Sequence, residues 1–125
     1  MDPYRPKRVL ITGFSPFRGI DTNPSWQGVN CMNLHDIQNK YNIELIQKEV
    51  DVTYEDVDVR VPRLWRNFQP DLTIHVGVSP AVSCFVLETQ ANRGGYTFPD
   101  NKDSSPLGAQ NVRNGPDTLV TQLDV

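Results

Sequence analysis

The segment at residues 8–19, RVLITGFSPFRG, limits the possible folds of this chain more than any other. Its first half, VLIT, is apolar without alternation, as in a strand that is covered on both faces. The strand ends at Gly13, and the loop after it carries Phe14 and Phe17. Exposed aromatic surface is unfavourable, so aromatic side chains in such a loop pack into the core or bind a ligand. The residues alone leave both interpretations open.

The next two segments predict a helix and a second strand. Asn23 and Pro24 combine a helix-capping residue with a proline at the first helical position, so we expect a helix over residues 24–39. Residues 43–50, IELIQKEV, alternate in a way that leaves one face drier than the other. This alternation is typical of a strand.

A second helix is expected between residues 53 and 68. The sequence TYED at residues 53–56 has the Ser/Thr-x-x-acid pattern of a helix start, and apolar residues follow at helical spacing. Pro62 should kink or divide this helix, and residues 57–61 also alternate as a strand would. We favour the helix because the length of the segment and its aromatic end, Trp65 and Phe68, suit it.

The pattern changes along the rest of the chain. Residues 72–78 predict a third strand, and residues 83–88 predict a fourth. Glycine and proline break any periodicity over residues 91–116, which we expect to form a long loop. Residues 117–125 could begin a helix, although the segment is too short to pack one well.

The order strand, helix, strand, helix, strand predicts a single α/β domain over residues 1–125. Its sheet should be open and largely parallel, with helices on both faces. Ligands bind such sheets outside the carboxyl ends of the strands. We therefore expect Phe14, Phe17 and the turn that contains Val78 to lie near one cleft.

Composition narrows the class of protein. The net charge of −3 argues against nucleic acid as the main partner, and the charged run at residues 5–8 is interpreted as a solvated strand entry. No apolar run approaches a membrane span, and the N-terminus lacks the apolar core of a signal peptide. We therefore expect a cytosolic protein without a membrane partner, in which Cys31 and Cys84 are reduced thiols.

Motifs for other chemistries are weak. The sequence has neither nucleotide-binding fingerprint, G-x-G-x-x-G or G-x-x-x-x-G-K-[ST], which argues against nucleotide binding. A small nucleotide binder therefore stays only as a third hypothesis. Cys31 and His35 lie four residues apart, but two ligands do not make a zinc site, and His75 is interpreted as a structural histidine. We expect no metal and no cofactor. Glu88 follows an apolar run, and it is either solvated at a strand end or held at a cleft.

Several segments together resemble the pyroglutamyl-peptidase I family, also called pyrrolidone-carboxylate peptidases. The core T-G-F-x-P-F, then N-P-S-W, then V-G, is a fairly specific combination. The segments follow the order of the family at close to its spacing, over what would be the N-terminal three-fifths of a typical member. The matching residues are 9–18, 23–26, 70–77, 87–88, 95–96, 100–101 and 115–116.

The resemblance implies a fold, an activity and site residues. The family has an open α/β sandwich of the phosphorylase/hydrolase-like kind, and it consists of cytosolic cysteine peptidases that remove an N-terminal pyroglutamyl residue. Phe14 and Phe17 match the rings that clamp the pyroglutamyl lactam, and we include Val78 among the substrate-binding residues. Glu88 matches the catalytic glutamate. The implied partners are peptides with an N-terminal pyroglutamyl residue, and the oligomeric state is not implied.

The departures from the family matter as much. The nucleophilic cysteine of the family lies in a downstream A-G-x-[FY]-x-C segment, followed by the catalytic histidine, and this chain contains neither. We therefore expect a truncated chain without peptidase activity of its own. The alternative is a non-catalytic module that binds pyroglutamyl peptides or associates with itself. Around Glu88 the pattern also differs, since Thr89, Gln90, Arg93 and Pro80 stand where the family commonly has other residues.

Overall fold

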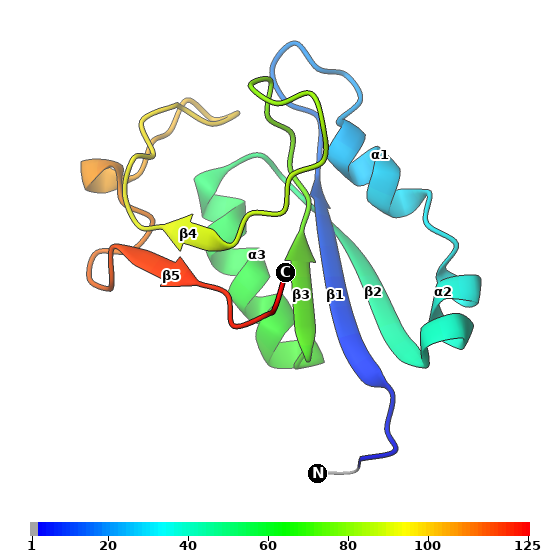
Figure 1. Ribbon diagram of the computed structural model, residues 1–125. Coiled ribbons are helices and arrows are strands. Elements are labelled where there is room, and N and C mark those ends of the chain that lie inside the picture. The colour runs from blue at the N-terminus through cyan, green and yellow to red at the C-terminus, as the bar shows by residue number, and fades with distance from the viewer. Residues whose placement is uncertain (1–2) are drawn as a thin grey trace. The chain divides into compact units, whose positions relative to one another are not determined.

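The computed structural model describes residues 3–125 (Figure 1). The chain divides into two compact units, Met1–Val78 and Ser79–Val125. No helix within residues 3–125 is long and apolar enough to cross a membrane.

The first unit is a three-stranded parallel sheet with the strand order β2-β1-β3. Strand β1 lies in the centre, and both neighbouring strands run in the same direction beside it (Figure 1). The predicted α/β class with a parallel sheet is confirmed. The elements of this unit are β1 (Lys7–Phe14), α1 (Pro24–Asn30), α2 (Leu34–Tyr41), β2 (Ile43–Val50), α3 (Tyr54–Phe68) and β3 (Leu72–His75).

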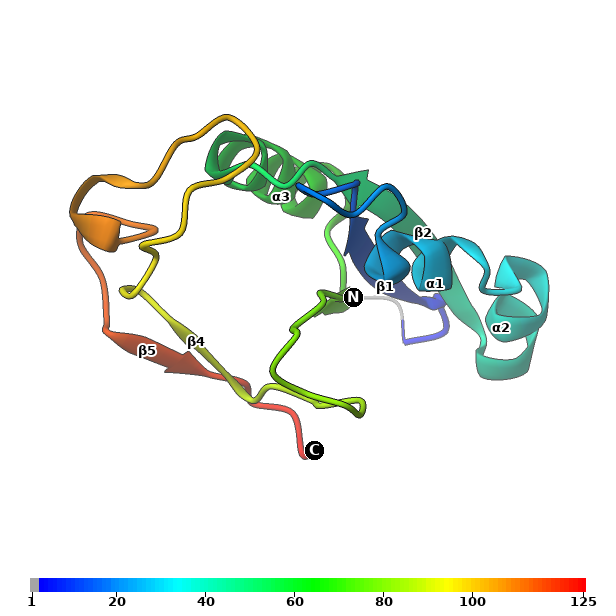
Figure 2. The same cartoon turned by 90° about the horizontal axis from the view of Figure 1, so that it is seen from above.

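Helices cover both faces of this sheet because the first crossover runs from β1 to β2, while the second runs back in the opposite direction from β2 to β3. Helices α1 and α2 pack on the face that carries Val9, Ile11 and Leu45, and Val29 of α1 completes this buried cluster. Helix α3 follows β2 and leads back past β1 to β3, and Figure 2 shows it apart from α1 and α2. Leu10, on the other face of β1, is completely buried.

The single helix expected over residues 24–39 is instead two helices. Helix α1 ends at its C-cap, Cys31, and Asn33 starts α2 by accepting a hydrogen bond from the Asp36 amide at 3.1 Å. The expectation is wrong because it treats Asn33 as an interruption of the apolar stripe. Asn33 is a second N-cap, and a capping side chain favours a helix start over a helix interior.

Helix α3 is continuous through Pro62, so the strand interpretation of residues 57–61 is wrong and the proline does not divide the helix. Thr53 caps the helix through a hydrogen bond from the Asp56 amide at 3.1 Å, as the sequence predicts. Proline in a helix interior costs about 3 kcal/mol. The amphipathic face of the helix and this cap outweigh that cost.

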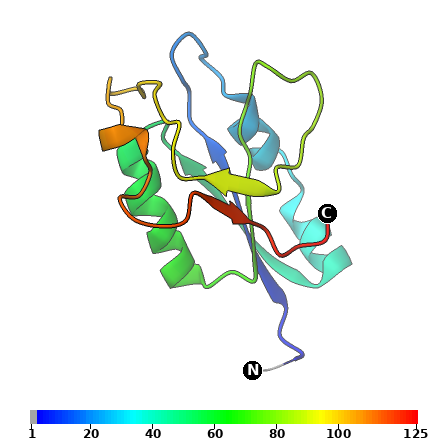
Figure 3. The same cartoon turned by 60° about the vertical axis from the view of Figure 1, so that its left-hand side comes forward.

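The second unit contains one small antiparallel ribbon, formed by β4 (Gln90–Asn92) and β5 (Thr118–Val120), with the short 3₁₀ helix η1 (Leu107–Ala109) between them (Figure 3). The expected strand at residues 83–88 is irregular, and the expected helix start at residues 117–125 is a strand. The apolar run at residues 84–87 predicted the first wrongly, because a strand needs a pairing partner and Phe85 is fully exposed.

Most of the expected loop over residues 91–116 is irregular, although β4 takes its first residues and η1 interrupts it. The third strand is shorter than predicted, since it ends at His75 and not at Val78. Residues 76–78 therefore lie in an irregular segment that follows the strand.

Candidate functional site

The carboxyl end of β1 lies close against the start of α1, and the residue at the contact, Gly13, has no room for a side chain. A Cβ built on Gly13 would lie 2.6 Å from the Cα of Trp26 and 2.8 Å from the carbonyl carbon of Ser25. Both atoms are backbone, so neither can move aside as a flexible side chain would. Glycine is thus needed at position 13 because only a residue without a side chain lets the backbones of β1 and α1 approach so closely.

Ser25 fixes the backbone of Phe14. Its hydroxyl lies 2.8 Å from the Phe14 amide nitrogen, which donates a hydrogen bond to it. The same hydroxyl donates to the side-chain oxygen of Asn23 at 2.8 Å, and the Ser25 amide donates to that oxygen at 3.0 Å. The Asn23 amide nitrogen in turn donates to the carbonyl of Ser15 at 2.9 Å. Asn23 and Ser25 are both buried, so these polar groups satisfy one another away from water.

The two most distinctive sequence motifs are therefore halves of one network. T-G-F ends the strand, and N-P-S-W both starts α1 and holds the residues that leave the strand. Ser15 adds a third anchor, because its amide donates to the carbonyl of Val50 at 2.9 Å and its hydroxyl donates to Asp51 at 3.1 Å. The loop begins at a defined position beside the end of β2.

Phe14 lies beside the segment that follows β3. A Cβ built on Gly77 would be 3.9 Å from Cε2 of the Phe14 ring, which is ordinary van der Waals contact. The Val76 amide donates to the carbonyl of Thr12 at 2.9 Å, so the chain stays paired with β1 for one residue beyond the strand. Val78, at the end of the same segment, is about half exposed. The structure thus places Phe14 at the turn that the sequence assigned to the site.

Phe17 occupies a tight turn further along the loop. Its amide donates to the carbonyl of Ile20 at 3.2 Å, and the Ile20 amide donates back to the carbonyl of Phe17 at 2.8 Å. Gly19 lies within this turn at φ +72, a conformation that favours glycine. Phe17 and Ile20 are each 37% exposed, so the turn presents two apolar side chains to solvent at its base.

His75 ends β3 and contacts two residues from different elements. Its Nδ1 lies 2.7 Å from the hydroxyl of Thr12, and its ring stacks on Trp65 with 6.4 Å between centroids and 30° between planes. Desolvation lowers the pKa of His75 below its usual value of about 6.5. The imidazole is therefore neutral at pH 7, although His75 as a whole residue is exposed. Sequence reasoning identified a structural histidine but named neither contact.

Glu88 belongs to the second unit. It is exposed in the irregular segment that precedes β4. Cys31 and Cys84 are free and exposed thiols, the first at the C-cap of α1 and the second in the second unit. Residues 3–125 hold no group of three or more His, Cys, Asp and Glu side chains suited to a metal ion.

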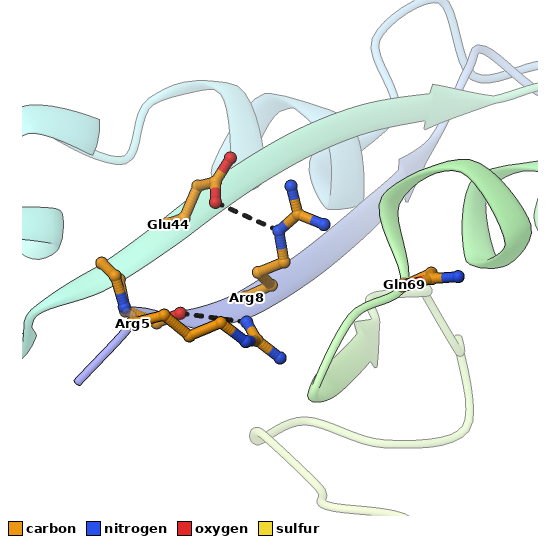
Figure 4. Close-up of a pocket in the computed structure, with 5 residues that line it drawn as sticks. Arg5, Arg8, Glu44 and Gln69 are labelled. Carbon is orange, nitrogen blue, oxygen red and sulfur yellow. Dashed lines mark hydrogen bonds and ion pairs between the residues drawn. The ribbon is translucent and has the colours of Figure 1, made fainter. Parts of the chain in front are cut away.

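A shallow depression of about 270 Å³ lies at the amino end of the sheet (Figure 4). Its charged side chains are already paired with protein. The guanidinium of Arg8 bonds Glu44 at 3.1 Å and the carbonyl of Phe68 at 2.7 Å, and it lies 4.9 Å above the Phe68 ring. These contacts join α3 to β1 and β2, which is a structural role. The lining residues are Arg5, Pro6, Arg8, Glu44 and Gln69.

Asp71 closes the same end of the sheet. It accepts the Arg8 amide at 2.8 Å and pairs with Arg5 at 3.0 Å. The hydrogen bond from the Arg8 backbone, helped by Arg5, lowers the pKa of Asp71. The P-D pair before β3 thus anchors the strand, while the residues assigned to ligand binding follow the opposite strand ends.

Sequence reasoning missed Ser25, Thr12 and Trp65. The signal for Ser25 was present, because a serine two residues after a capping asparagine can share that cap. Thr12 gave no separate signal, since threonine is common in strands. Trp65 meets His75 only through the packing of α3 on β3.

Comparisons with known proteins agree on one family. Residues 7–125 match the family model described as pyroglutamyl peptidase. Pyroglutamyl-peptidase 1 of Mus musculus is 32% identical over 119 residues, which cover 95% of this chain and 56% of the mouse protein. The pyrrolidone-carboxylate peptidase of Thermococcus onnurineus is 34% identical over 119 residues, which cover 94% of this chain and 58% of that protein.

Solved structures give the same result. The crystal structure of the pyroglutamyl peptidase I from Bacillus amyloliquefaciens matches with a TM-score of 0.81 at 28% identity, over 94% of this chain and 55% of that one. The pyrrolidone carboxyl peptidase from Thermococcus litoralis, at 23% identity and a TM-score of 0.76, supports the fold alone. The chain therefore spans a little over half the length of the relatives that it matches.

Proposed function

Because this chain belongs to the pyroglutamyl peptidase family, we propose that it recognises the N-terminal pyroglutamyl group of peptides. Phe14 and Phe17 are the proposed clamp for the lactam ring, with Val78 as a further contact and Glu88 as the catalytic glutamate. The observation that carries the proposal is the anchoring of Phe14, whose amide is held by Ser25 and whose ring lies beside Gly77.

The chemistry of the ligand suits such a site. A pyroglutamyl ring is small, flat and uncharged, so aromatic faces and a few polar contacts can hold it without burying a charge. Gly77 supports this role because it has no side chain to fill the space beside the Phe14 ring. Phe17, in a turn with two reciprocal backbone hydrogen bonds, offers a second aromatic ring from the loop that follows β1.

The proposed reaction of the whole enzyme is acyl transfer to a cysteine. The thiolate attacks the pyroglutamyl carbonyl and forms a tetrahedral oxyanion, which expels the amine of the next residue as that amine takes a proton from the histidine. Water then cleaves the thioester, which returns the thiol and releases pyroglutamate. The sequence holds no A-G-x-[FY]-x-C segment, so we propose that these 125 residues bind the ligand without hydrolysing it.

Ligand binding tests the recognition step. Titration of the 125-residue chain with 5-oxoproline amide, followed by ¹H–¹⁵N NMR, should shift the amides of Phe14 and Gly77 first. Phe14→Ala should weaken binding by about tenfold or more, since an aromatic contact contributes on the order of 1.5 kcal/mol beyond its area. Phe85→Ala is the matched control, because Phe85 is fully exposed in the second unit. Equal binding by both variants would remove Phe14 from the site.

Turnover tests the other half of the proposal. A fluorogenic pyroglutamyl amide should be stable in the presence of the chain. Hydrolysis that disappears with Cys31→Ser or Cys84→Ser would show that one of these thiols is the nucleophile. Such a result would overturn the assignment of the chain as a binding fragment.

The second candidate function is self-association, and exposed apolar side chains favour it. In the second unit Phe85, Leu87 and Leu107 are each at least 77% exposed. Such side chains often mark interaction surfaces. Sedimentation velocity over a hundredfold range of concentration separates the two functions, because a chain that only binds peptides sediments as a monomer throughout.

A further inference from the structure

Thr12 is a buried hydroxyl in an otherwise apolar stretch of β1. It is 2% exposed and shares its face of the strand with the fully buried Leu10. A hydroxyl without a hydrogen-bond partner in such a place is unfavourable. Its partner is Nδ1 of His75 at 2.7 Å, and the two residues are also paired in the β1–β3 register.

A valine at this position would fill the same volume without a polar atom and would suit the strand equally well. Packing alone therefore gives no reason for the hydroxyl. Its contribution lies in the bond to His75, which no apolar side chain could supply.

His75 is held from a second direction by Trp65. The rings stack with their centroids 6.4 Å apart, and Trp65 comes from the last turns of α3. The strand end is therefore tied to its neighbouring strand through a hydrogen bond and to a helix through ring packing. Both contacts lie on the face of the sheet opposite Val9 and Ile11.

The segment assigned to the ligand begins directly after His75. The carbonyl of Thr12 accepts the Val76 amide at 2.9 Å, so Thr12 binds the chain through its backbone as well as its side chain. Gly77 is the next residue, and it lies beside the Phe14 ring. Thr12 is two residues before Phe14. One short stretch of β1 therefore carries the Phe14 ring and also forms the hydrogen bonds to His75 and Val76, which precede Gly77.

We infer that Thr12 and His75 are positioning residues, which hold the segment at residues 76–78 in register with the Phe14 ring. For the ligand, this inference rests on the proposed recognition of a pyroglutamyl group. For the contact between Phe14 and Gly77, it rests on the geometry alone.

The protonation state of the pair is consistent with this role. Because desolvation keeps the pKa of His75 below its usual value, the imidazole is neutral at pH 7 and its Nδ1 can accept a hydrogen bond from a hydroxyl. We assign the ring proton to Nε2 and the donor role to Thr12 on this basis. No charged side chain among residues 3–125 contributes to the lowering of this pKa.

The test uses four variants of the 125-residue chain. Thr12→Val removes the hydroxyl and keeps the shape, while Thr12→Ser restores the hydroxyl. His75→Phe keeps a ring against Trp65 and removes the acceptor, while His75→Asn places an acceptor oxygen near the position of Nδ1. Each pair separates the hydrogen bond from the packing, and the ring-keeping variant decides the question if Thr12→Val does not fold.

Two readouts are independent of thermal stability. The nuclear Overhauser effect between the Phe14 ring and the α protons of Gly77 should weaken in Thr12→Val and His75→Phe and return in Thr12→Ser and His75→Asn. The dissociation constant for 5-oxoproline amide should rise about tenfold in the first two variants, which is the effect expected for the loss of one hydrogen bond. A contact and an affinity within twofold of the parent in both variants would overturn the inference.

If the parent chain fails to bind 5-oxoproline amide, the proposed function fails, while the contact between Phe14 and Gly77 still decides the positioning role.

Discussion

The two units of this chain are stabilised in different ways. In the first unit a parallel sheet buries apolar side chains under helices on both faces, and Leu10 and Val50 are almost fully inaccessible. In the second unit the single buried side chain among the described residues is Asp100, a carboxylate. Apolar burial dominates folding free energy, so the first unit has the means to be stable and the second depends on directional polar contacts.

Two residues, Asp100 and Arg93, make several of those polar contacts. The Asp100 carboxylate accepts the amides of Lys102 at 2.8 Å and Ser104 at 3.0 Å, which closes a turn. Arg93 pairs with Asp117 at 2.6 Å, and its backbone bonds Asp117 and Asn111 at 2.9 Å each. Local hydrogen bonds shape a loop without a core, and such regions open at lower free energy than a packed sheet.

The largest expected effect comes from the core of the first unit. Leu10→Ala should lower the free energy of unfolding by about 3 kcal/mol, because Leu10 is completely buried and the truncation leaves a cavity. Leu119→Ala, at a leucine that is 64% exposed in β5, should change it by less than about 0.5 kcal/mol. Urea denaturation of both variants makes the comparison. Similar losses would mean that the two units share one source of stability.

Ser25→Ala should have the next largest effect, about 1.5 kcal/mol, because it leaves the Phe14 amide without its partner and removes one of the two hydrogen bonds to the Asn23 oxygen. Hydrogen exchange at the Phe14 amide should accelerate far more than at amides in β2. Ser83→Ala, at an exposed position in the second unit, provides the control. Unchanged exchange at Phe14 would show that the network does not hold the loop.

Arg93→Gln should weaken the second unit alone, by about 1 kcal/mol of local opening free energy, since it removes the bond to Asp117. Limited proteolysis within residues 111–117 should become faster, while the amides of β1 keep their protection. Loss of protection in β1 as well would contradict the independence of the two units.

The smallest effect is expected at Asp71. Its pKa is lowered in the folded state, so the stabilisation is present above the usual value near 3.8 and is lost as the pH falls through the lower folded value. Asp71→Asn should therefore reduce the melting temperature slightly at pH 6, and this reduction should shrink as the pH falls through the lowered pKa of Asp71. A reduction of constant size over the whole acidic titration would exclude the carboxylate charge as the cause.

The two units also differ in how well local residues predict their structure. The three strands of the first unit were predicted, because an apolar run covered on both faces and a capped helix are signals that local residues carry by themselves. In the second unit the apolar run at residues 84–87 was misleading, since a strand exists only when it has a partner. The actual strands there, β4 and β5, lack any apolar pattern and exist through their mutual pairing.

In the candidate site, local residues predict some of the members but not the contacts between them. Phe14 could be selected from its place after a buried strand, and Gly77 from the end of the third strand. The dependence of Phe14 on Ser25, and of the Gly77 segment on Thr12, could not be predicted, because each joins residues from different elements. Phe17, Val78 and Glu88 remain predictions as site residues.

The sequence by itself determined the family, the α/β class and the residues that end each parallel strand, because these depend on local patterns of apolar, glycine and capping residues. Tertiary structure alone decided that Thr12 meets His75 and Trp65, and that Gly13 has to be a glycine. The physical reason is that segments far apart in the chain form a hydrogen bond or a close backbone contact only when the distance between them is correct to within a few tenths of an ångström. Only the packed sheet and its helices set those distances.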